Sequence, residues 1–181
     1  DVHPDKVFTT PLGVDPSFKV TDNENKLRQV AEKYSLPEQF ILYLGTIEPR
    51  KNLPLLIQIY KQLVDEGILH KLVLVGKYGW MYDEVLDLIK ELDLQSKVIM
   101  TGYIAQNDLP LVYNLASLFV YPTIYEGFGL PALEAMACGV PVITSRIASL
   151  PEIVGEAGLL VTVGNEKELK QAMERILEDI D

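Results

Sequence analysis

Short, unbroken apolar runs recur along this chain, and their centres lie roughly 20 to 30 residues apart, the spacing that crossover connections between parallel strands require. The runs are Phe40–Leu44, Leu72–Val75, Val98–Thr101, Leu118–Tyr121, Pro141–Thr144 and Leu159–Val163. Several of them end directly at a glycine or a proline. Their continuous apolar character predicts strands that are buried on both faces, as they are in parallel sheets.

Amphipathic helical patterns lie between these runs. Apolar residues recur at spacings of three and four over Leu27–Tyr34, Leu56–Val64, Val85–Leu92 and Leu169–Ile180. Alternation of strands with helices fits right-handed crossovers in a parallel sheet. No internal repeat and no second core is visible. We therefore expect an α/β fold with one Rossmann-like, doubly wound parallel sheet.

The first 18 residues have a different character. Three prolines, a glycine and several aspartates surround the short apolar-rich piece Val7–Thr10, and no initiator methionine is present. We predict that residues 1–18 are an interdomain linker running into a first strand and that residues 19–181 form the folded domain, as in a piece of a longer protein. The alternative is an ordinary irregular N-terminus.

Composition narrows the function classes. The chain has 181 residues, 48% of them apolar and 23% charged, which are values of a globular protein. Its formal net charge of −10 argues against a broad nucleic-acid surface, so an anionic ligand would need a locally positive pocket. The single cysteine, Cys138, excludes an internal disulfide, and we expect it in the core. His70 is expected in solvent. No apolar run has the length of a membrane span, so we expect a cytoplasmic protein.

Several familiar ligand motifs are missing. The sequence contains no G-x-G-x-x-G at a strand–helix junction and no G-x-x-x-x-G-K-[ST]. Its one D-x-D, Asp179–Asp181, ends the last predicted helix and reads as a solvated tail. We therefore expect neither a metal nor another cofactor. Since ligands of open parallel sheets bind beyond the carboxyl ends of the strands, the loops there are the candidate site.

The most informative of these loops follows the strand that ends at Tyr121. It contains Gly127 and Gly129, which let backbone approach a ligand closely, and a helix is expected to start near Leu130. The N–H groups at the start of that helix suit an anion. Glu126 lies in the loop, and Glu134 lies about one turn into the helix.

These two glutamates resemble a known motif. The stretch reads Glu126-Gly-Phe-Gly-Leu-Pro-Ala-Leu-Glu134. It resembles the E-x7-E motif of retaining glycosyltransferases, and its surroundings resemble family 4, group 1, of the GT-B enzymes, the mannosyltransferase and glucosyltransferase type. Further matching segments are Pro11–Asp15, Leu44–Asn52, Val75–Gly76, Thr101–Tyr103 and Leu150–Glu152. The resemblance covers roughly residues 7 to 177 but only the C-terminal half of that family's two-domain enzyme.

The resemblance implies that residues 19–181 bind a nucleotide-diphosphate sugar. Glu134 would accept hydrogen bonds from the ribose hydroxyls. Glu126 would contact the transferred sugar and the positive charge that develops at its anomeric carbon. Arg50 and Lys51 would stabilise the departing diphosphate, which makes them catalytic together with Glu126. Many members carry an arginine where this chain has Thr46, so we take Arg50 as the substitute cation.

Backbone groups would complete the donor site. The resemblance implies donor contacts for Gly45 and Thr46 after the first long strand and for Tyr103 and Ile104 near the nucleobase. It implies the same for residues at the helix start, namely Gly127, Phe128, Gly129 and Leu130. The ring of Phe128 is expected to pack, and Tyr103 either stacks on the base or packs in the core.

Two function classes remain open. In the first, the chain is the donor-binding half of an enzyme that transfers a hexose with retention. The missing N-terminal domain would then hold the acceptor and any peripheral contact with a membrane, and this piece alone would be inactive. In the second, the chain is a non-catalytic nucleotide-sugar binding module or half of a sugar-nucleotide epimerase. The presence of Glu126 favours the first, because a protein that binds only the nucleotide would not require it.

Overall fold

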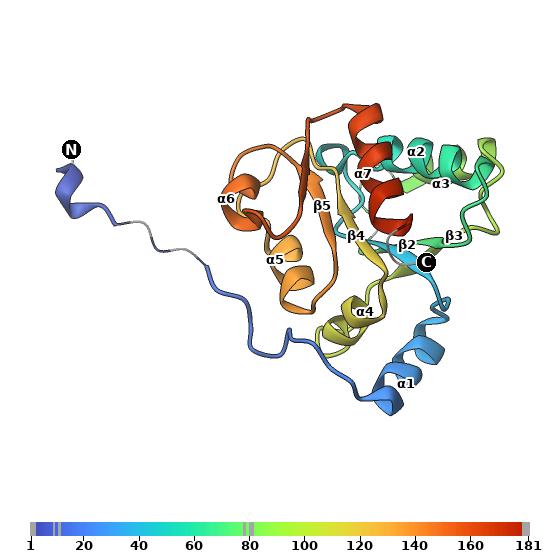
Figure 1. Ribbon diagram of the computed structural model, residues 1–181, viewed down its shortest axis with the longest axis horizontal. Helices are drawn as coiled ribbons and strands as arrows, with labels where there is room; N and C mark the ends of the chain where they lie inside the picture. The colour runs from blue at the N-terminus through green and yellow to red at the C-terminus, as the bar shows by residue number, and fades with distance from the viewer. Residues whose placement is uncertain (1–2, 9, 11, 78, 80–81, 179–181) are drawn as a thin grey trace.

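A single six-stranded parallel sheet forms the centre of the molecule (Figure 1). The computed structural model describes residues 3–8, 10, 12–77, 79 and 82–178. The strands are β1 (Phe40–Leu44), β2 (Lys71–Val75), β3 (Val98–Gly102), β4 (Leu118–Tyr121), β5 (Val142–Ser145) and β6 (Leu159–Val161), in the order β3-β2-β1-β4-β5-β6. Each of the six expected strands forms, with its ends within two residues of the apolar run, and the predicted fold class is confirmed.

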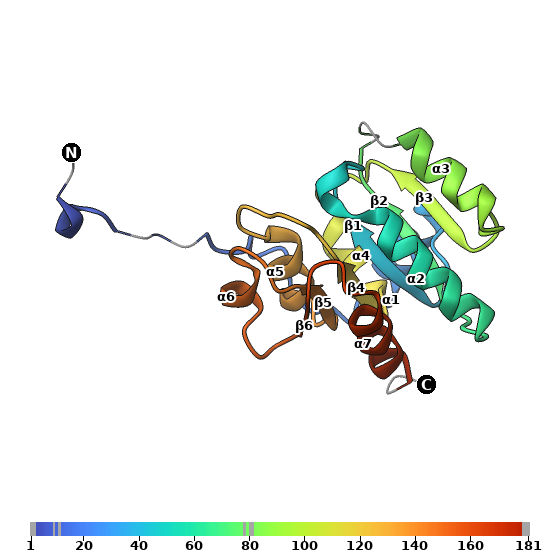
Figure 2. The same cartoon turned by 90° about the horizontal axis from the view of Figure 1, so that it is seen from above.

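Helices cover both faces of the sheet. They are α1 (Glu24–Tyr34), α2 (Leu53–Asp65), α3 (Tyr82–Glu91), α4 (Leu109–Leu115), α5 (Leu130–Ala137), α6 (Leu150–Val154) and α7 (Glu166–Glu178). Figures 1 and 2 show α2, α3 and α7 on one face, and α1, α4 and α5 on the other with α6 beside α5. β1 and β4 therefore lie between two layers and two neighbouring strands, which is why their side chains are almost entirely buried.

Four of the helices begin in the same way. A Leu-Pro pair opens α2, α4, α5 and α6. Proline suits the first turn because its ring fixes a helical φ and because the N–H that it lacks would have no partner within the helix. α1 begins differently, since the side chain of Asn23 accepts a hydrogen bond from the backbone N–H of Lys26 at 3.1 Å.

The strand order reverses between β1 and β4, and in open α/β sheets such a reversal leaves a crevice beyond the carboxyl ends of the two strands. After β1 the chain passes through α2 on one face to reach β2, and after β4 it passes through α5 on the opposite face to reach β5. The loops that leave the carboxyl ends of these adjacent strands therefore diverge. Such a reversal of strand order is where open α/β sheets bind their ligands.

The N-terminal segment differs from the expectation. Among its described residues it contains one short 3₁₀ turn, η1 (Pro4–Lys6), and no strand, so the first strand expected around Val7–Thr10 is wrong at the residues the structure describes. Figure 1 shows this segment extending away from the sheet, where no neighbouring strand is available for pairing. Phe8 is 82% exposed. The packed body includes Phe18, whose ring contacts Tyr113 edge-on at 5.9 Å.

Two single-residue expectations have opposite outcomes. Cys138 is buried, as predicted, and its pKa is raised to about 11 by burial. His70 is 1% exposed, so its expected position in solvent is wrong: the chain turns inward there to begin β2, and the hydroxyl of Tyr60 donates to the His70 carbonyl at 2.9 Å.

Within the described part of the chain, no helix combines the length and apolar character that crossing a bilayer requires.

Glycines that follow β1 and β2 set how closely the chain segments approach at the carboxyl edge of the sheet. Gly45 N–H donates to the Val75 carbonyl at 2.9 Å, and Gly76 N–H donates to the Gly102 carbonyl at 3.0 Å. Gly76 has φ of +152°, and a Cβ there would stand 2.0 Å from the Gly45 carbonyl oxygen. That contact is with backbone, so it cannot be relieved by a change of rotamer.

Gly76→Ala is therefore expected to lower the free energy of unfolding by about 1–3 kcal/mol, through overpacking and backbone strain. Denaturant unfolding followed by circular dichroism measures this change. Gly13→Ala is the matched control, because a Cβ at Gly13 meets nothing within 4 Å. Equal stabilities of the two variants would contradict the packing argument.

Candidate functional site at the ends of β1 and β4

The loop after β1 carries two adjacent cations into the crevice. A 3₁₀ turn, η2 (Pro49–Lys51), follows β1, and Asn52 then adopts the left-handed conformation before α2 begins. This turn separates the two side chains. Lys51 is 5% exposed, whereas the Arg50 side chain is 45% exposed and pairs with Glu48 at 2.7 Å.

The loop after β4 is tied to this turn by backbone contacts. The N–H of Ile124 donates to the Arg50 carbonyl at 2.7 Å. The hydroxyl of the buried Thr123 lies 2.8 Å from the carbonyls of both Arg50 and Tyr125. The two diverging loops are thus joined at their bases, which fixes the distance between the residues that each contributes.

Lys51, Tyr121 and Glu126 form one hydrogen-bonded cluster at this junction. The Lys51 ammonium lies 2.5 Å from Oε2 of Glu126 and also donates to the hydroxyl of Tyr121. That hydroxyl in turn donates to the same carboxylate oxygen at 2.6 Å. The Arg50 guanidinium approaches Oε2 at 3.4 Å from the solvent side. Three groups, two from the turn after β1 and one from the end of β4, therefore converge on a single carboxylate of the loop after β4.

Burial and pairing act in opposite directions on the charges of the cluster. Burial alone would raise the pKa of Glu126, but the hydrogen bonds from Lys51 and Tyr121 outweigh it and hold that pKa below its usual value. Burial lowers the pKa of Lys51, and Glu126 opposes the shift. The pKa of Tyr121 is raised by burial and by the neighbouring carboxylate, so its hydroxyl keeps its proton and acts as a donor.

Glu134 occupies a different part of the same edge. It lies on α5, and its Oε2 accepts a hydrogen bond from the hydroxyl of Tyr113 in α4 at 3.0 Å. Burial is the main cause that raises its pKa, the Tyr113 bond opposes the rise, and Asp15 adds to it. A half-buried carboxylate with one bonded oxygen retains acceptor capacity for two hydroxyls of a ligand.

The start of α5 lies between these two glutamates. Gly129 is the residue before the helix, with φ of +104°, and no side chain caps the first turn. A Cβ at Gly129 would stand 2.4 Å from a methyl of Leu150, so the loop passes against α6 at this point. The Ser149 hydroxyl donates to the Phe128 carbonyl at 2.6 Å and holds the loop there. Because Pro131 has no N–H and the N–H groups of Ala132 and Leu133 donate to the Gly129 carbonyl, the Leu130 N–H is the group of this first turn that suits an anion, among the bonds of the described residues.

The remaining predicted donor residues lie along the same edge in differing environments. Gly45 uses its N–H within the sheet, and the exposed Thr46 accepts the Tyr43 hydroxyl at 3.3 Å through its carbonyl. Tyr103 is 66% exposed, which removes the alternative that it packs in the core. Ile104 is buried, so only its backbone can face a ligand.

The structure thus brings Glu126, Lys51 and Arg50 into contact and places Glu134 in a separate hydrogen-bonded pair. Sequence reasoning missed Tyr121 and Tyr113, which hold the two glutamates. The only signal for Tyr121 was a hydroxyl-bearing residue at the last position of an apolar strand. Tyr113 had none, because its partner Glu134 lies 21 residues away.

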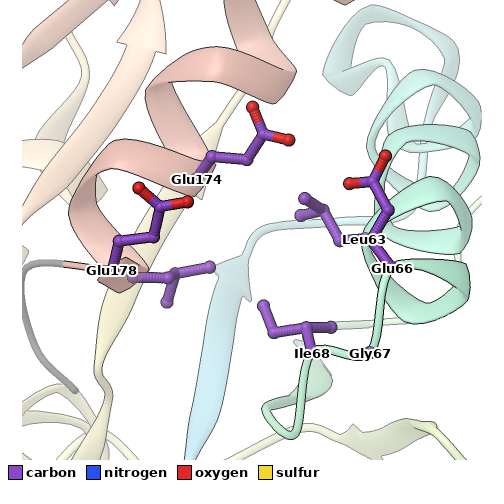
Figure 3. A pocket seen from close by; sticks show the side chains of 7 residues that line it. Leu63, Glu66, Gly67, Ile68, Glu174 and Glu178 are labelled. Atoms are coloured by element: carbon purple, nitrogen blue, oxygen red, sulfur yellow. The ribbon is translucent and has the colours of Figure 1, made fainter.

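A hollow of about 240 Å³ lies away from this edge, between the C-terminal ends of α2 and α7, and Figure 3 shows Glu66, Glu174 and Glu178 around its apolar residues. Lys170 pairs with both Glu66 and Glu174 there. Because helices between parallel strands run antiparallel to them, the C-terminal end of α2 lies at the amino edge of the sheet. Within the described ranges, no group of three or more potential ligands could hold a metal ion, and Asp179–Asp181 lie outside those ranges.

Comparison with known proteins identifies the family. A sequence model described as "Glycosyl transferases group 1" matches residues 23–181. The O-antigen chain mannosyltransferase B of Escherichia coli is 42% identical over 158 residues, which are 86% of this chain and 41% of that protein. The sucrose-phosphate synthase of Thermosynechococcus elongatus superposes with a TM-score of 0.79 at 32% identity, over 93% of this chain and 43% of that chain.

A third similarity concerns a single domain. The crystal structure of the C-terminal domain of the group 1 glycosyl transferase LpcC from Francisella tularensis superposes with a TM-score of 0.79 at 25% identity, over 93% of this chain and 89% of that one. The chain therefore spans less than half the length of the mannosyltransferase and the synthase but nearly all of a separately crystallised domain. With a family model that matches most of its length and a relative of this identity, the chain belongs to the group 1 family of glycosyltransferases.

Proposed function

We propose that this chain binds the nucleotide-diphosphate sugar donor of an enzyme that transfers a hexose with retention. One observation carries the proposal: Lys51 and Glu126 meet at the crevice between β1 and β4, beside the uncapped start of α5. This places a cation, an anion and free N–H donors within one loop cluster of a strongly acidic chain. The relative at 42% identity is named as a mannosyltransferase, which makes mannose our choice of hexose.

The cations and the helix start would hold the diphosphate. Lys51 is fixed by Glu126 and Tyr121 and still has one N–H to donate, while Arg50 is exposed and can move toward a ligand. As the bond between sugar and diphosphate breaks, negative charge grows on the leaving oxygen. Fixed positive charge and N–H groups stabilise that charge without first having to reorient.

The two glutamates would hold the two sugars. Oε2 of Glu126 is occupied by Lys51 and Tyr121, whereas Oε1 contacts only the N–H of Gly127, at 3.2 Å, among the contacts of the described residues. Oε1 is therefore the oxygen available to hydroxyls of the hexose and to the positive charge at its anomeric carbon. Glu134 would accept from the ribose hydroxyls.

The acceptor would bind elsewhere in a longer protein. The chain spans 41% of the mannosyltransferase relative, and its described residues contribute the loops after β1 and β4. A second domain opposite the ends of β1 and β4 would enclose the donor and exclude water from the reacting bond. We therefore expect this chain alone to bind donor weakly and to transfer little or no sugar.

Binding to sugar nucleotides is the direct test. Isothermal titration calorimetry with UDP-, GDP- and ADP-hexoses is expected to reveal binding of one of them, and Glu134→Ala to weaken it about ten- to a hundredfold, the cost of one hydrogen bond to a charged group. Glu84→Ala, at an exposed glutamate of α3, is the control. The absence of binding to all three, or equal binding by the Glu134→Ala protein, would refute the donor site.

Binding is also expected to weaken on acidification. Because the pKa of Glu134 is raised, its carboxylate takes up a proton at a higher pH than an exposed glutamate does, and its acceptor strength is lost as the pH falls through that pKa. Glu126, with a lowered pKa, protonates only at lower pH. Calorimetry between about pH 8 and pH 4.5 should find this weakening in the wild-type chain. The Glu134→Gln chain should show no such pH dependence of its affinity. If its affinity still falls on acidification, a group other than Glu134 is responsible.

Lys51 and Arg50 are expected to contribute unequally to the affinity for the diphosphate. Lys51→Met should weaken binding of the nucleoside diphosphate about a hundredfold, and Arg50→Met about tenfold, because the exposed arginine already pairs with Glu48 and is screened by solvent. Calorimetry with the nucleoside diphosphate measures both, after circular dichroism has verified folding. A larger loss for Arg50→Met would make arginine the principal diphosphate ligand.

A further inference from the structure

Tyr121 is the residue through which the cluster is attached to the sheet. It is the last residue of β4 and is 1% exposed. Its ring stacks on Phe119 with centroids 5.8 Å apart and on Tyr43 with centroids 6.2 Å apart. Its carbonyl accepts the Thr144 hydroxyl at 2.9 Å from the neighbouring strand. The position of its hydroxyl is therefore set by the core and does not depend on the loops.

That hydroxyl organises both charged partners. It accepts a hydrogen bond from Lys51 and donates one to Oε2 of Glu126 at 2.6 Å. The Lys51 ammonium also lies 4.5 Å from the centroid of the Tyr121 ring, within the range of a cation–π contact. The Tyr121 hydroxyl thus holds one residue from each loop, Lys51 after β1 and Glu126 after β4, and it belongs to neither loop.

The consequence is a distinction between the two carboxylate oxygens. Oε2 of Glu126 accepts from Tyr121 and Lys51 on the core side, and Oε1 is left on the side of the Gly127 backbone. Rotation of the carboxylate would break two short hydrogen bonds, one of them charged. The group is therefore held with a single oxygen presented outward.

We propose that Tyr121 is a positioning residue of the site: its hydroxyl fixes Glu126 and Lys51 so that one carboxylate oxygen faces the hexose. The inference rests on the proposed function for the identity of the ligand but not for the geometry. Tyr121 touches neither sugar nor diphosphate in this scheme. It acts by holding groups that would otherwise move independently on two loops.

The charged surroundings of Glu126 determine how this is tested. Lys51 and Arg50 face it from the turn after β1, together with Glu48, which pairs with Arg50; Tyr121 faces it from β4, and Tyr43 lies behind Tyr121 on β1. Removing the Tyr121 hydroxyl takes away one of the two close donors that favour the ionised carboxylate and leaves the cations in place. Glu126 should then protonate at a higher pH.

The first measurement needs no ligand. Carbon-13 NMR titration of the side-chain carboxyls of labelled glutamate, with the Glu126 signal identified by its loss in Glu126→Gln, follows the protonation of this residue in the folded chain. In Tyr121→Phe the acid dissociation constant of Glu126 is expected to fall about tenfold, a change of one pKa unit. Tyr60→Phe removes a buried, hydrogen-bonded hydroxyl far from the cluster and should leave that constant unchanged.

The second measurement separates positioning from general damage. Tyr121→Phe should weaken binding of the nucleotide hexose about tenfold more than binding of the corresponding nucleoside diphosphate. The reason is that, in the proposed site, Glu126 contacts the hexose, which the nucleoside diphosphate lacks. Tyr60→Phe should leave the ratio of the two affinities unchanged. An equal loss for both ligands, or an unchanged dissociation constant of Glu126, would overturn the proposal.

If Tyr121→Phe is too unstable for the NMR titration, a double-mutant cycle measured by denaturant unfolding tests the same coupling between Tyr121 and Glu126. The changes in the free energy of unfolding for Tyr121→Phe, Glu126→Gln and the double variant should be non-additive if the two groups act together, and additivity would contradict the proposal. The two hypotheses remain distinguishable. Absence of nucleotide-sugar binding by the wild-type chain would refute the proposed function, while the NMR titration and the cycle would still decide the role of Tyr121.

Discussion

The site depends on placing a buried lysine and a partly buried glutamate in contact at the junction of two loops. Neither charge would be stable there alone, because removing either from water costs more than the fold could supply without a partner. Lys51 and Glu126 solve this by meeting at 2.5 Å, with the Tyr121 hydroxyl bonded to both. The pair therefore joins the loops after β1 and β4 and places a cation and an anion at the same point of the crevice.

The sheet topology makes that meeting possible. β1 and β4 are neighbours in the sheet, although Lys51 and Glu126 are 75 residues apart in the chain. The helices that follow the two strands pack on opposite faces, so the two loops leave the sheet in different directions beyond the contacts that join their bases. The strand ends and the stacked rings of Tyr43, Tyr121 and Phe119 pack beneath the charged pair and support it.

An acidic protein that binds an anion has to concentrate its positive charge. The net charge of −10 offers no long-range attraction to a diphosphate, so recognition would depend on Lys51, Arg50 and the first turn of α5. Glu126 neutralises part of that charge when no ligand is present, which keeps the buried lysine ionised. In the proposed function the same carboxylate would also contact the hexose of the donor, so that a single group would have a structural and a ligand-binding role.

The six strands, the long helices and the fold class could be predicted from the amino-acid pattern, because apolar runs and three-to-four spacing report directly on burial at a regular period. Local motifs also pointed to Glu126, Glu134, Lys51 and Arg50 as the candidate residues. Three findings required the folded chain: Lys51 and Glu126 touch, Tyr121 and Tyr113 bind the two glutamates, and the described residues around Val7 and Phe8 form no strand. Those facts depend on which strands become neighbours and on side chains brought together from distant positions, and no local pattern in the chain encodes such contacts.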